Sequence, residues 1–341
     1  MPRWAPGAPP HAGRAVSGFA GAGRLPCGRV IYANELSPWL IRAVAFVFGA
    51  AWGSFFNVAI YRWPREMSVV APPSHCPACK APIPWWRNVP IAGWLVLRGK
   101  AACCGARVSP RYLLVELLSA VLCVALAEQY FVRADAITSL QDAGLLTLVY
   151  FAFTGALVVA TFVDVDFMEI PDEVTLPGAA LGLATAVMRP EPGAAEAALG
   201  AGGGYLLVQL VFVWSYERLT GRRGMGEGDS KLLLMIGAFL GWRGAIFAIV
   251  AGALQGLVVA GIALASGKTI GPAEHREDED DGEREDDGEH EHDSEHEPGD
   301  EPPPDHVGHM KVPYGPFLAL GALEFLFFGD WIIDQYLGLF M

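Results

Sequence analysis

The chain has 341 residues, of which 52% are hydrophobic and only 18% are charged, and its formal net charge is −13. Soluble domains usually carry roughly 25% charged residues, so this composition argues against an ordinary cytosolic enzyme. Residues 274–305 hold 18 Asp or Glu and two Arg, so the rest of the chain is only weakly basic and offers no dense basic face for a nucleic acid.

Eight apolar runs approach the roughly 20 residues that a helix needs to cross a bilayer. Within hydrocarbon every backbone amide needs an internal partner, so these runs should be helical. We therefore predict an all-α polytopic membrane protein with about eight transmembrane helices and a small cytoplasmic Cys-containing domain. A large soluble protein with buried core helices is the alternative, but the runs are too long and too free of charge. The runs lie near residues 38–60, 113–131, 143–163, 174–188, 196–216, 231–243, 244–266 and 314–341.

Composition divides the chain further. The start is rich in Gly, Ala, Pro and Arg without periodicity, and a later segment is a low-complexity run of Glu, Asp, His and Pro that is too polar to bury a core. The predicted segments are a disordered N-terminal extension (1–36), the first transmembrane helix (37–61), the cytoplasmic Cys-containing domain (62–112), the transmembrane core (113–267), an acidic cytoplasmic loop (268–310) and the last transmembrane helix (311–341).

The distribution of Lys and Arg predicts the orientation in the membrane. The connections 61–112 and 217–231 are both basic, and with eight spans they fall on the same side as the acidic loop. That side should be cytoplasmic, which places both termini outside. Four Arg residues before the first span oppose this assignment.

The first basic connection contains a possible metal site. Cys76 and Cys79 have the C-x-x-C spacing of a zinc knuckle, and a second pair should follow some 15–20 residues later. Cys103 and Cys104 follow instead, with no spacer between them. Neighbouring cysteines are poorly placed to occupy two corners of one tetrahedron. The four cysteines are thus candidate zinc ligands, and the alternatives are three thiolates with another donor, or thiols that bind no metal.

Acidic residues gather where the third apolar run ends. Asp164 follows directly on that run, and Asp166, Glu169 and Asp172 come within the next eight residues. Ionisable groups at that depth are expensive and usually functional. Pro171 favours the end of one helix and the start of another. Asp172 has the alternative role of an N-cap, and Glu169 that of a charge at headgroup level.

A second acid begins a later apolar run. Gly224, Gly226 and Gly228 allow tight backbone turns, and they deliver Asp229 to the start of that run. A phosphate-binding loop is the rival interpretation, but the pattern G-x-x-x-x-G-K-[ST] is absent. In the predicted topology Asp164 and Asp229 face the same membrane surface.

Two carboxyls within a few ångströms of each other cannot both ionise cheaply, so one keeps its proton. The ionised carboxylate can take a proton from a water that attacks a peptide carbonyl. The protonated one can stabilise the oxyanion and later protonate the leaving amine. The residues therefore favour an aspartyl protease at the membrane surface, with ion transport as the competing use of paired intramembrane acids.

From about Gly49 to Gly321 the sequence resembles the bacterial type IV prepilin peptidases (leader peptidase and N-methyltransferase), which are inner-membrane aspartyl proteases of the GxGD class. The order and joint presence of the motifs make this resemblance specific. The motifs that carry it are Gly53–Pro64, Cys76 with Cys79, Trp94–Gly99, Ser109–Glu116, Asp164–Asp166 with Ile170–Asp172, Gly226–Asp229 with Lys231–Leu233, and Pro313–Phe317.

The resemblance implies that Asp164 and Asp229 are the catalytic pair within 113–267. It implies cleavage after a Gly at the end of a short basic leader of a prepilin or pseudopilin whose apolar helix lies in the lipid bilayer, at the cytoplasmic face of the inner membrane. Methylation of the new N-terminus with S-adenosylmethionine would follow, and we place the methylating residues loosely in the loop 62–112. Supporting roles fall to Asp166, Asp172, Gly226, Gly228, Lys231 and Glu116.

The sequence departs from the family pattern in its second cysteine pair. Ala101 stands where the first Cys of that pair is expected, Cys104 fits the second position, and Cys103 is extra. A protease without methyltransferase activity is therefore the alternative among enzymes, and a polytopic transporter or assembly scaffold is the alternative outside them.

Overall fold

The structure is a computed structural model that describes residues 35–76, 78–84, 87–133, 138–189, 191–220, 226–266 and 313–338. Nearly all of the predicted N-terminal extension and the whole acidic loop lie outside these residues. The described residues form helices and no strand, which confirms the predicted helical class. The helices are α1 (Pro38–Arg62), α2 (Ala92–Val96), α3 (Pro110–Ala127), α4 (Leu140–Phe167), α5 (Asp172–Thr185), α6 (Ala194–Leu207), α7 (Tyr216–Thr220), α8 (Glu227–Ala265) and α9 (Gly315–Gly338). A 3₁₀ turn (Trp63–Arg65) follows α1, and π-helical turns follow α3 (Glu128–Val132) and α6 (Val208–Ser215).

Five helical segments are long and apolar enough to cross a membrane within the described part of the chain. The chain is therefore a helical membrane protein, as its composition predicts. Helix α5, with 14 residues, and the stretch Gly315–Gly329 of α9 are shorter than these five segments. The five segments are Pro38–Arg65, Pro110–Val132, Leu140–Phe167, Ala194–Leu219 and Glu227–Ala263.

Local sequence signals explain where the helices begin and end. The Ser109 side chain accepts a hydrogen bond from the backbone N–H of Arg111 and caps α3, and Ser139 caps α4 by accepting from the N–H of Asp142. Helix α4 ends at Met168, whose φ of 55° is left-handed and whose N–H closes the last turn on the carbonyl of Asp164. This stop fixes Asp164 in the final turn of the helix.

Helix α8 contains the two predicted runs 231–243 and 244–266, separated by a sharp break at Gly241. Gly241 has φ 69° and ψ −174°, a conformation that residues with a side chain rarely adopt. Gly228, in the first turn of the first half, packs against Ile170, and Gly252, in the middle of the second half, packs against Tyr314. The second half of α8 thus runs back toward the end of the helix bundle at which the first half begins.

The side chain of Arg189 donates hydrogen bonds to backbone carbonyl oxygens next to this break. Arg189 is 5% exposed, and its guanidinium donates to the carbonyl oxygens of Gly182 at 2.6 Å, Ala238 at 2.8 Å and Phe239 at 2.6 Å. Carbonyls near the end of a helical segment need donors from elsewhere when water is excluded, and a cation there also complements the helix dipole. Arg189 therefore fixes α5 against the first half of α8.

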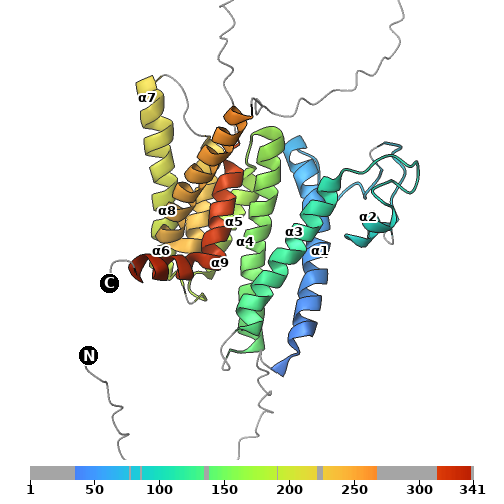
Figure 1. Ribbon diagram of the computed structural model, residues 1–341, viewed down its shortest axis with the longest axis horizontal. Coiled ribbons are helices and arrows are strands. Elements are labelled where there is room, and N and C mark those ends of the chain that lie inside the picture. The colour runs from blue at the N-terminus through green and yellow to red at the C-terminus, as the bar shows by residue number, and fades with distance from the viewer. Residues whose placement is uncertain are drawn as a thin grey trace, which may run out of the picture.

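Helix α4 lies between two groups of helices (Figure 1). Helices α1 and α3 pack on one side, and α5, α6, α8 and α9 lie on the other. Helix α4 is also the most buried of the five spans, with 67% of its most apolar stretch inside the protein. Because α4 touches both groups, the residue at its end can meet side chains from α8 and α9.

Candidate functional site

Asp164 and Asp229 come together at one end of the bundle, although 65 residues separate them in sequence. Asp164 lies in the last turn of α4 and is 6% exposed, and Asp229 lies in the first turn of α8 and is 8% exposed. Both carboxylates line one cavity of about 520 Å³. The structure thus brings together the two acids that the sequence places on one membrane face.

Each carboxylate accepts a hydrogen bond from the backbone of a glycine. The N–H of Gly315, the first residue of α9, donates to Asp164 Oδ2 at 2.8 Å, and the N–H of Gly226 donates to Asp229 Oδ2 at 3.2 Å. A Cβ atom on Gly315 would lie only 2.7 Å from Asp164 Oδ2. Gly315 belongs to the Pro313–Phe317 motif of the sequence. Its contact with Asp164 could not be predicted, because no spacing rule links residues 151 positions apart.

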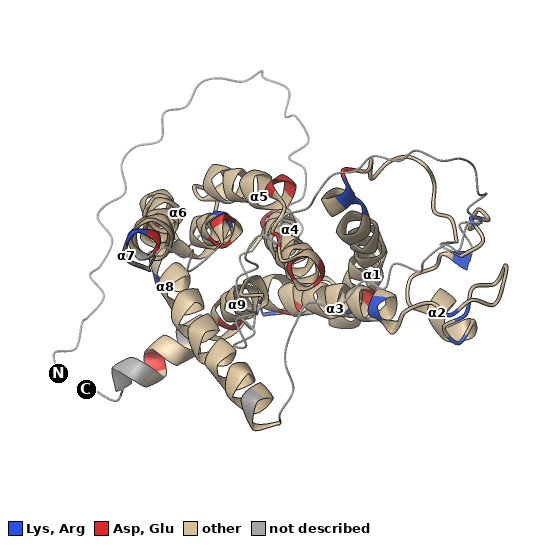
Figure 2. Cartoon of the chain, turned by 90° about the horizontal axis from the view of Figure 1, so that it is seen from above, with Lys and Arg blue, Asp and Glu red and all other residues tan. Residues whose placement is uncertain are grey.

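The cavity is strongly acidic. Seven of its lining residues are Asp or Glu, and Lys231 is the one basic residue among the described residues that line it. Seen from above, acidic residues of the chain lie on α4 and α5, and basic residues lie on α1 and near α2 (Figure 2). A cavity of this charge favours a positively charged chain. The acidic lining residues are Glu66, Asp164, Glu169, Asp172, Glu173, Glu227 and Asp229.

An ion pair at the cavity mouth joins α5 to α8. Lys231 Nζ lies 2.6 Å from Asp172 Oδ1 and 2.7 Å from Oδ2. The N-cap of α5 is Pro171, so Asp172 is the first helical residue and the alternative role of N-cap for Asp172 is wrong. In the same first turn of α8, a Cβ atom on Gly228 would come 3.0 Å from Ile170 Cβ. These contacts hold the first turn of α8 close to the chain between α4 and α5.

Asp166 is directed away from the cavity that Asp164 lines. Its carboxylate forms an ion pair with Arg111 of α3, and Arg111 also donates to the carbonyl of Phe162 at 3.1 Å. Asp166 does not line the cavity. Its contact joins the start of α3 to the end of α4, so it orients the turn that carries Asp164.

Glu116 also lies apart from the two buried aspartates. It is 8% exposed on α3, and its Oε2 accepts a hydrogen bond from the backbone N–H of Ile91 at 2.7 Å. Ile91 precedes α2 and has a positive φ of 62°. Glu116 therefore anchors the Cys-containing segment to the helix bundle, and it does not line the cavity of Asp164 and Asp229.

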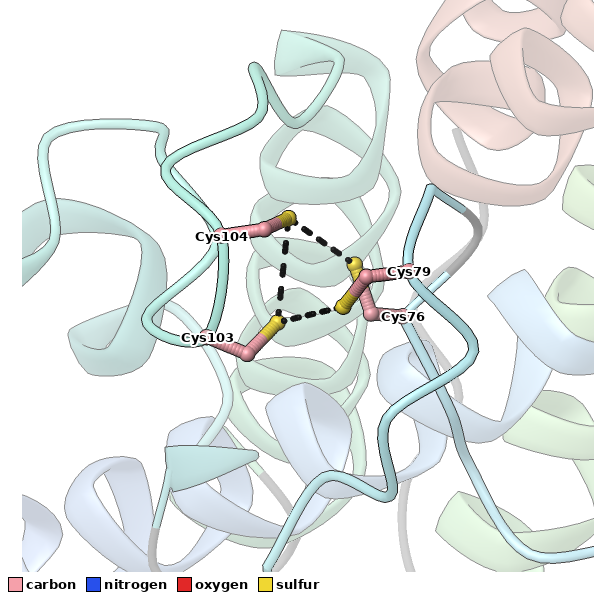
Figure 3. A group of neighbouring side chains, drawn as sticks. All are labelled: Cys76, Cys79, Cys103 and Cys104. Atoms are coloured by element: carbon pink, nitrogen blue, oxygen red, sulfur yellow. Dashed lines mark hydrogen bonds between the residues drawn. The ribbon is translucent and has the colours of Figure 1, made fainter.

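Four cysteine side chains meet in the segment between α1 and α3 (Figure 3). The Sγ atoms of Cys79 and Cys103 lie 3.2 Å apart, those of Cys76 and Cys104 3.7 Å, and those of Cys103 and Cys104 3.9 Å. All four Sγ atoms lie within 4.8 Å of one another. Although neighbouring cysteines are expected to be poorly placed for one tetrahedral site, the structure brings Cys103 and Cys104 into the same cluster.

The backbone explains how adjacent cysteines reach one site. In the first loop the N–H of Cys76 donates to the carbonyl of Ala81, and the N–H of Lys80 donates to that of Cys76. The second loop repeats both bonds: the N–H of Ala101 donates to Ala106, and the N–H of Gly105 donates to Ala101. Lys80 and Gly105, which occupy equivalent places, both have a positive φ. The second loop therefore has the same backbone shape as the first, with Ala101 in the position that Cys76 occupies in the first loop.

The thiol chemistry and geometry of this cluster fit a zinc ion. A tetrahedral zinc with Zn–S bonds of about 2.3 Å requires sulfur atoms about 3.8 Å apart, close to the spacing seen here. Backbone N–H groups of Cys79 and Ala78 lower the pKa of the Cys76 thiol to about 6, and hydrogen bonding to Cys79 raises the pKa of Cys103 to about 12. Metal binding at this cluster would therefore release a proton from Cys103.

These features define a helical membrane protein that buries two aspartates in one cavity and carries a separate cluster of four thiols. The chain matches the Bacterial Peptidase A24 N-terminal domain over residues 47–130 and the Type IV leader peptidase family over residues 151–261. It belongs to the type IV leader peptidase family, as the sequence motifs predict.

Curated relatives cover most of the chain. A prepilin leader peptidase/N-methyltransferase from Aeromonas hydrophila is 32% identical over 89% of this chain and 96% of its own length. Proteins with the same name from Myxococcus xanthus and Neisseria gonorrhoeae are 30% and 36% identical, over 86% and 67% of this chain and 92% and 83% of their own lengths. No solved structure matches the chain.

Proposed function

We propose that this protein is a prepilin leader peptidase that cleaves its precursors with Asp164 and Asp229. The observation that carries this proposal is the burial of both carboxylates in one cavity at helix ends, each held by a backbone N–H. The names of the relatives supply the substrate class and the reaction.

In this mechanism the two carboxyls share one proton. The ionised carboxylate takes a proton from water, and the water oxygen bonds to the carbonyl carbon of the scissile peptide. The protonated carboxyl stabilises the oxygen that becomes negative, and it then gives its proton to the leaving amine as the C–N bond breaks. The low dielectric around the buried pair strengthens both effects.

The acidic cavity supports a basic leader as the part of the precursor that enters it. Glu66, Glu169, Glu173 and Glu227 surround the two buried aspartates, and Lys231 is already paired with Asp172. A leader with Lys or Arg would gain attraction on approach, and the scissile bond after its final Gly would lie next to the pair. Glycine leaves room for the backbone to approach the carboxylates closely.

We place the cavity at the cytoplasmic face of the bacterial inner membrane, with about eight transmembrane helices. The break at Gly241 supports this count, since it divides α8 into two antiparallel halves. With α5 and α9 as further spans, both ends of the Cys-containing domain 62–112 fall at the cavity end. The bias of Lys and Arg toward that end supports a cytoplasmic location.

Methylation of the new N-terminus with S-adenosylmethionine is the second activity that we propose. The names of the relatives support this activity. We place the methylating groups within residues 62–112. The methyl donor would supply the carbon that joins the amine freed by cleavage.

We propose that Cys76, Cys79, Cys103 and Cys104 hold a structural zinc ion. Purified protein is expected to contain about one zinc per chain, and Cys103→Ser is expected to lose most of it, because a fourth thiolate is needed to close a tetrahedral site. Moving the thiol to the standard position, with Ala101→Cys and Cys103→Ala together, is expected to restore binding. Elemental analysis of the detergent-solubilised protein measures the ratio.

Cys123→Ser is the matched control, since Cys123 is buried in α3 outside the cluster. It should leave the zinc content unchanged. Full zinc content in Cys103→Ser would mean that three thiolates and another donor hold the ion. An unaltered protein that contains no zinc would contradict the proposed zinc site.

The test of the proposed function is mass spectrometry of the N-terminus of a prepilin co-expressed with this protein. We expect the leader to be removed after its Gly and the new N-terminus to gain one methyl group. Cleavage without the methyl group would identify a protease alone. An uncut precursor in the presence of correctly inserted protein would favour a transporter or assembly scaffold.

A further inference from the structure

A second hollow lies between α1, α4 and α5, and it is almost entirely apolar. Its volume is about 340 Å³. Its floor is the small-residue face of α4 with Ala152, Gly155 and Ala156, and one wall is formed by aromatic residues of α1, including Trp52 and Phe56. Trp52 is 44% exposed, so the hollow opens at the surface of a membrane-spanning helix, where lipid chains or another helix would meet it.

The hollow adjoins the cavity of the two buried aspartates. Trp63, in the turn that follows α1, and Glu173, in the first turn of α5, line both of them. A chain seated in the hollow therefore ends at two residues that also line the cavity of Asp164 and Asp229. The apolar surface thus borders the candidate catalytic site, which an ordinary lipid-facing surface need not do.

The dimensions suit one face of a helix. The hollow follows α4 from Leu148 to Val159, which is about 16 Å of helix, and it ends five residues before Asp164. A volume of about 340 Å³ is too small for a whole helix, but it accepts the side chains that project from one helical face. A helix seated there would place its end, and the extended residues before it, next to the aspartates.

We propose that this hollow docks the apolar helix that follows the scissile bond of the precursor. The proposal rests on the prepilin peptidase function and specifies where the enzyme holds its substrate. The acidic cavity receives the polar leader and the apolar hollow receives the helix, so the two surfaces match the two halves of one chain. Trp63 separates the halves at the level where cleavage occurs.

The test fills the hollow with one large side chain. Ala152→Trp occupies its floor, and Ala253→Trp makes the same change at an exposed position of α8 outside it. We expect Ala152→Trp to lower kcat/KM for a full-length precursor in proteoliposomes by at least about tenfold, mainly through KM, because the catalytic groups are untouched. Ala253→Trp should leave kcat/KM unchanged. Unaltered cleavage by Ala152→Trp, or a loss confined to kcat, would overturn the proposal.

A photo-crosslinking experiment decides the matter even if Ala152→Trp folds poorly. Benzoylphenylalanine replaces Leu148 in the hollow or, as the control, Val121 on the exposed face of α3, in protein that carries Asp229→Asn to slow turnover. We expect crosslinks to the apolar helix of the precursor from position 148 and none from position 121. Crosslinks from 148 to lipid alone would overturn the docking site. A wild-type protein that cleaves no precursor would instead overturn the proposed function.

Discussion

Replacing either Asp164 or Asp229 with Asn is expected to lower precursor cleavage by at least about 10³-fold, and replacing both is expected to cost little more. Asn has the shape of Asp and can still accept the hydrogen bonds from Gly315 and Gly226, so the helices should assemble normally. It cannot take a proton from water, however, and two groups that share one proton fail together. Initial rates with a purified precursor, for both single variants and the double variant, measure this.

Asp142→Asn is the matched control. Asp142 lies in the first turn of α4, at the opposite end of the helix from Asp164. It should retain cleavage close to that of the unaltered protein. Near-normal rates in either single variant, or losses that multiply in the double variant, would contradict the shared-proton mechanism.

Gly315→Ala is expected to lower cleavage by about 10²-fold without loss of the folded protein. The added Cβ would lie 2.7 Å from Asp164 Oδ2, so the carboxylate has to move away from Asp229. Gly315 has no positive φ and begins α9, where Ala is a better helix former than Gly. The damage should therefore appear in kcat and leave the melting temperature unchanged or higher.

Gly261→Ala serves as the control for this change, because a Cβ atom at Gly261 in α8 meets nothing within 4 Å. Its cleavage rate should equal that of the unaltered protein. Equal rates in Gly315→Ala would mean that the position of Asp164 does not limit the reaction.

The helical class and the meeting of Asp164 with Asp229 could be predicted from the sequence for a simple reason. Apolar runs of membrane length must be helices, and the number of runs between two residues decides whether they share a face. Asp164 and Asp229 are separated by an even number of runs, so the topology alone brings them to one surface. Their catalytic role is still a prediction, and the variants above test it.

Other features depend on backbone conformation that no periodicity reveals. How the adjacent Cys103 and Cys104 reach one cluster could not be predicted, because the separation of neighbouring Sγ atoms depends on loop shape, and the hydrogen bonds of Ala101 with Gly105 and Ala106 set that shape. The role of Arg189 could not be predicted from the sequence, because its guanidinium donates hydrogen bonds to carbonyl oxygens near the break at Gly241, about 50 residues away in sequence. The contact of Gly315 with Asp164 is equally invisible, since it joins two helix ends through a backbone N–H.

The repeated hydrogen bonding of the two cysteine loops has a practical consequence for genome mining. The shape of such a loop is maintained by main-chain hydrogen bonds and a residue with positive φ. A cysteine can therefore stand two positions further along the sequence, at 103 instead of 101, in a loop of the same fold. Sequence searches that require two intact C-x-x-C pairs will discard chains of this kind. A search that requires the glycine at position 105 and its four-residue separation from position 101 would retain them.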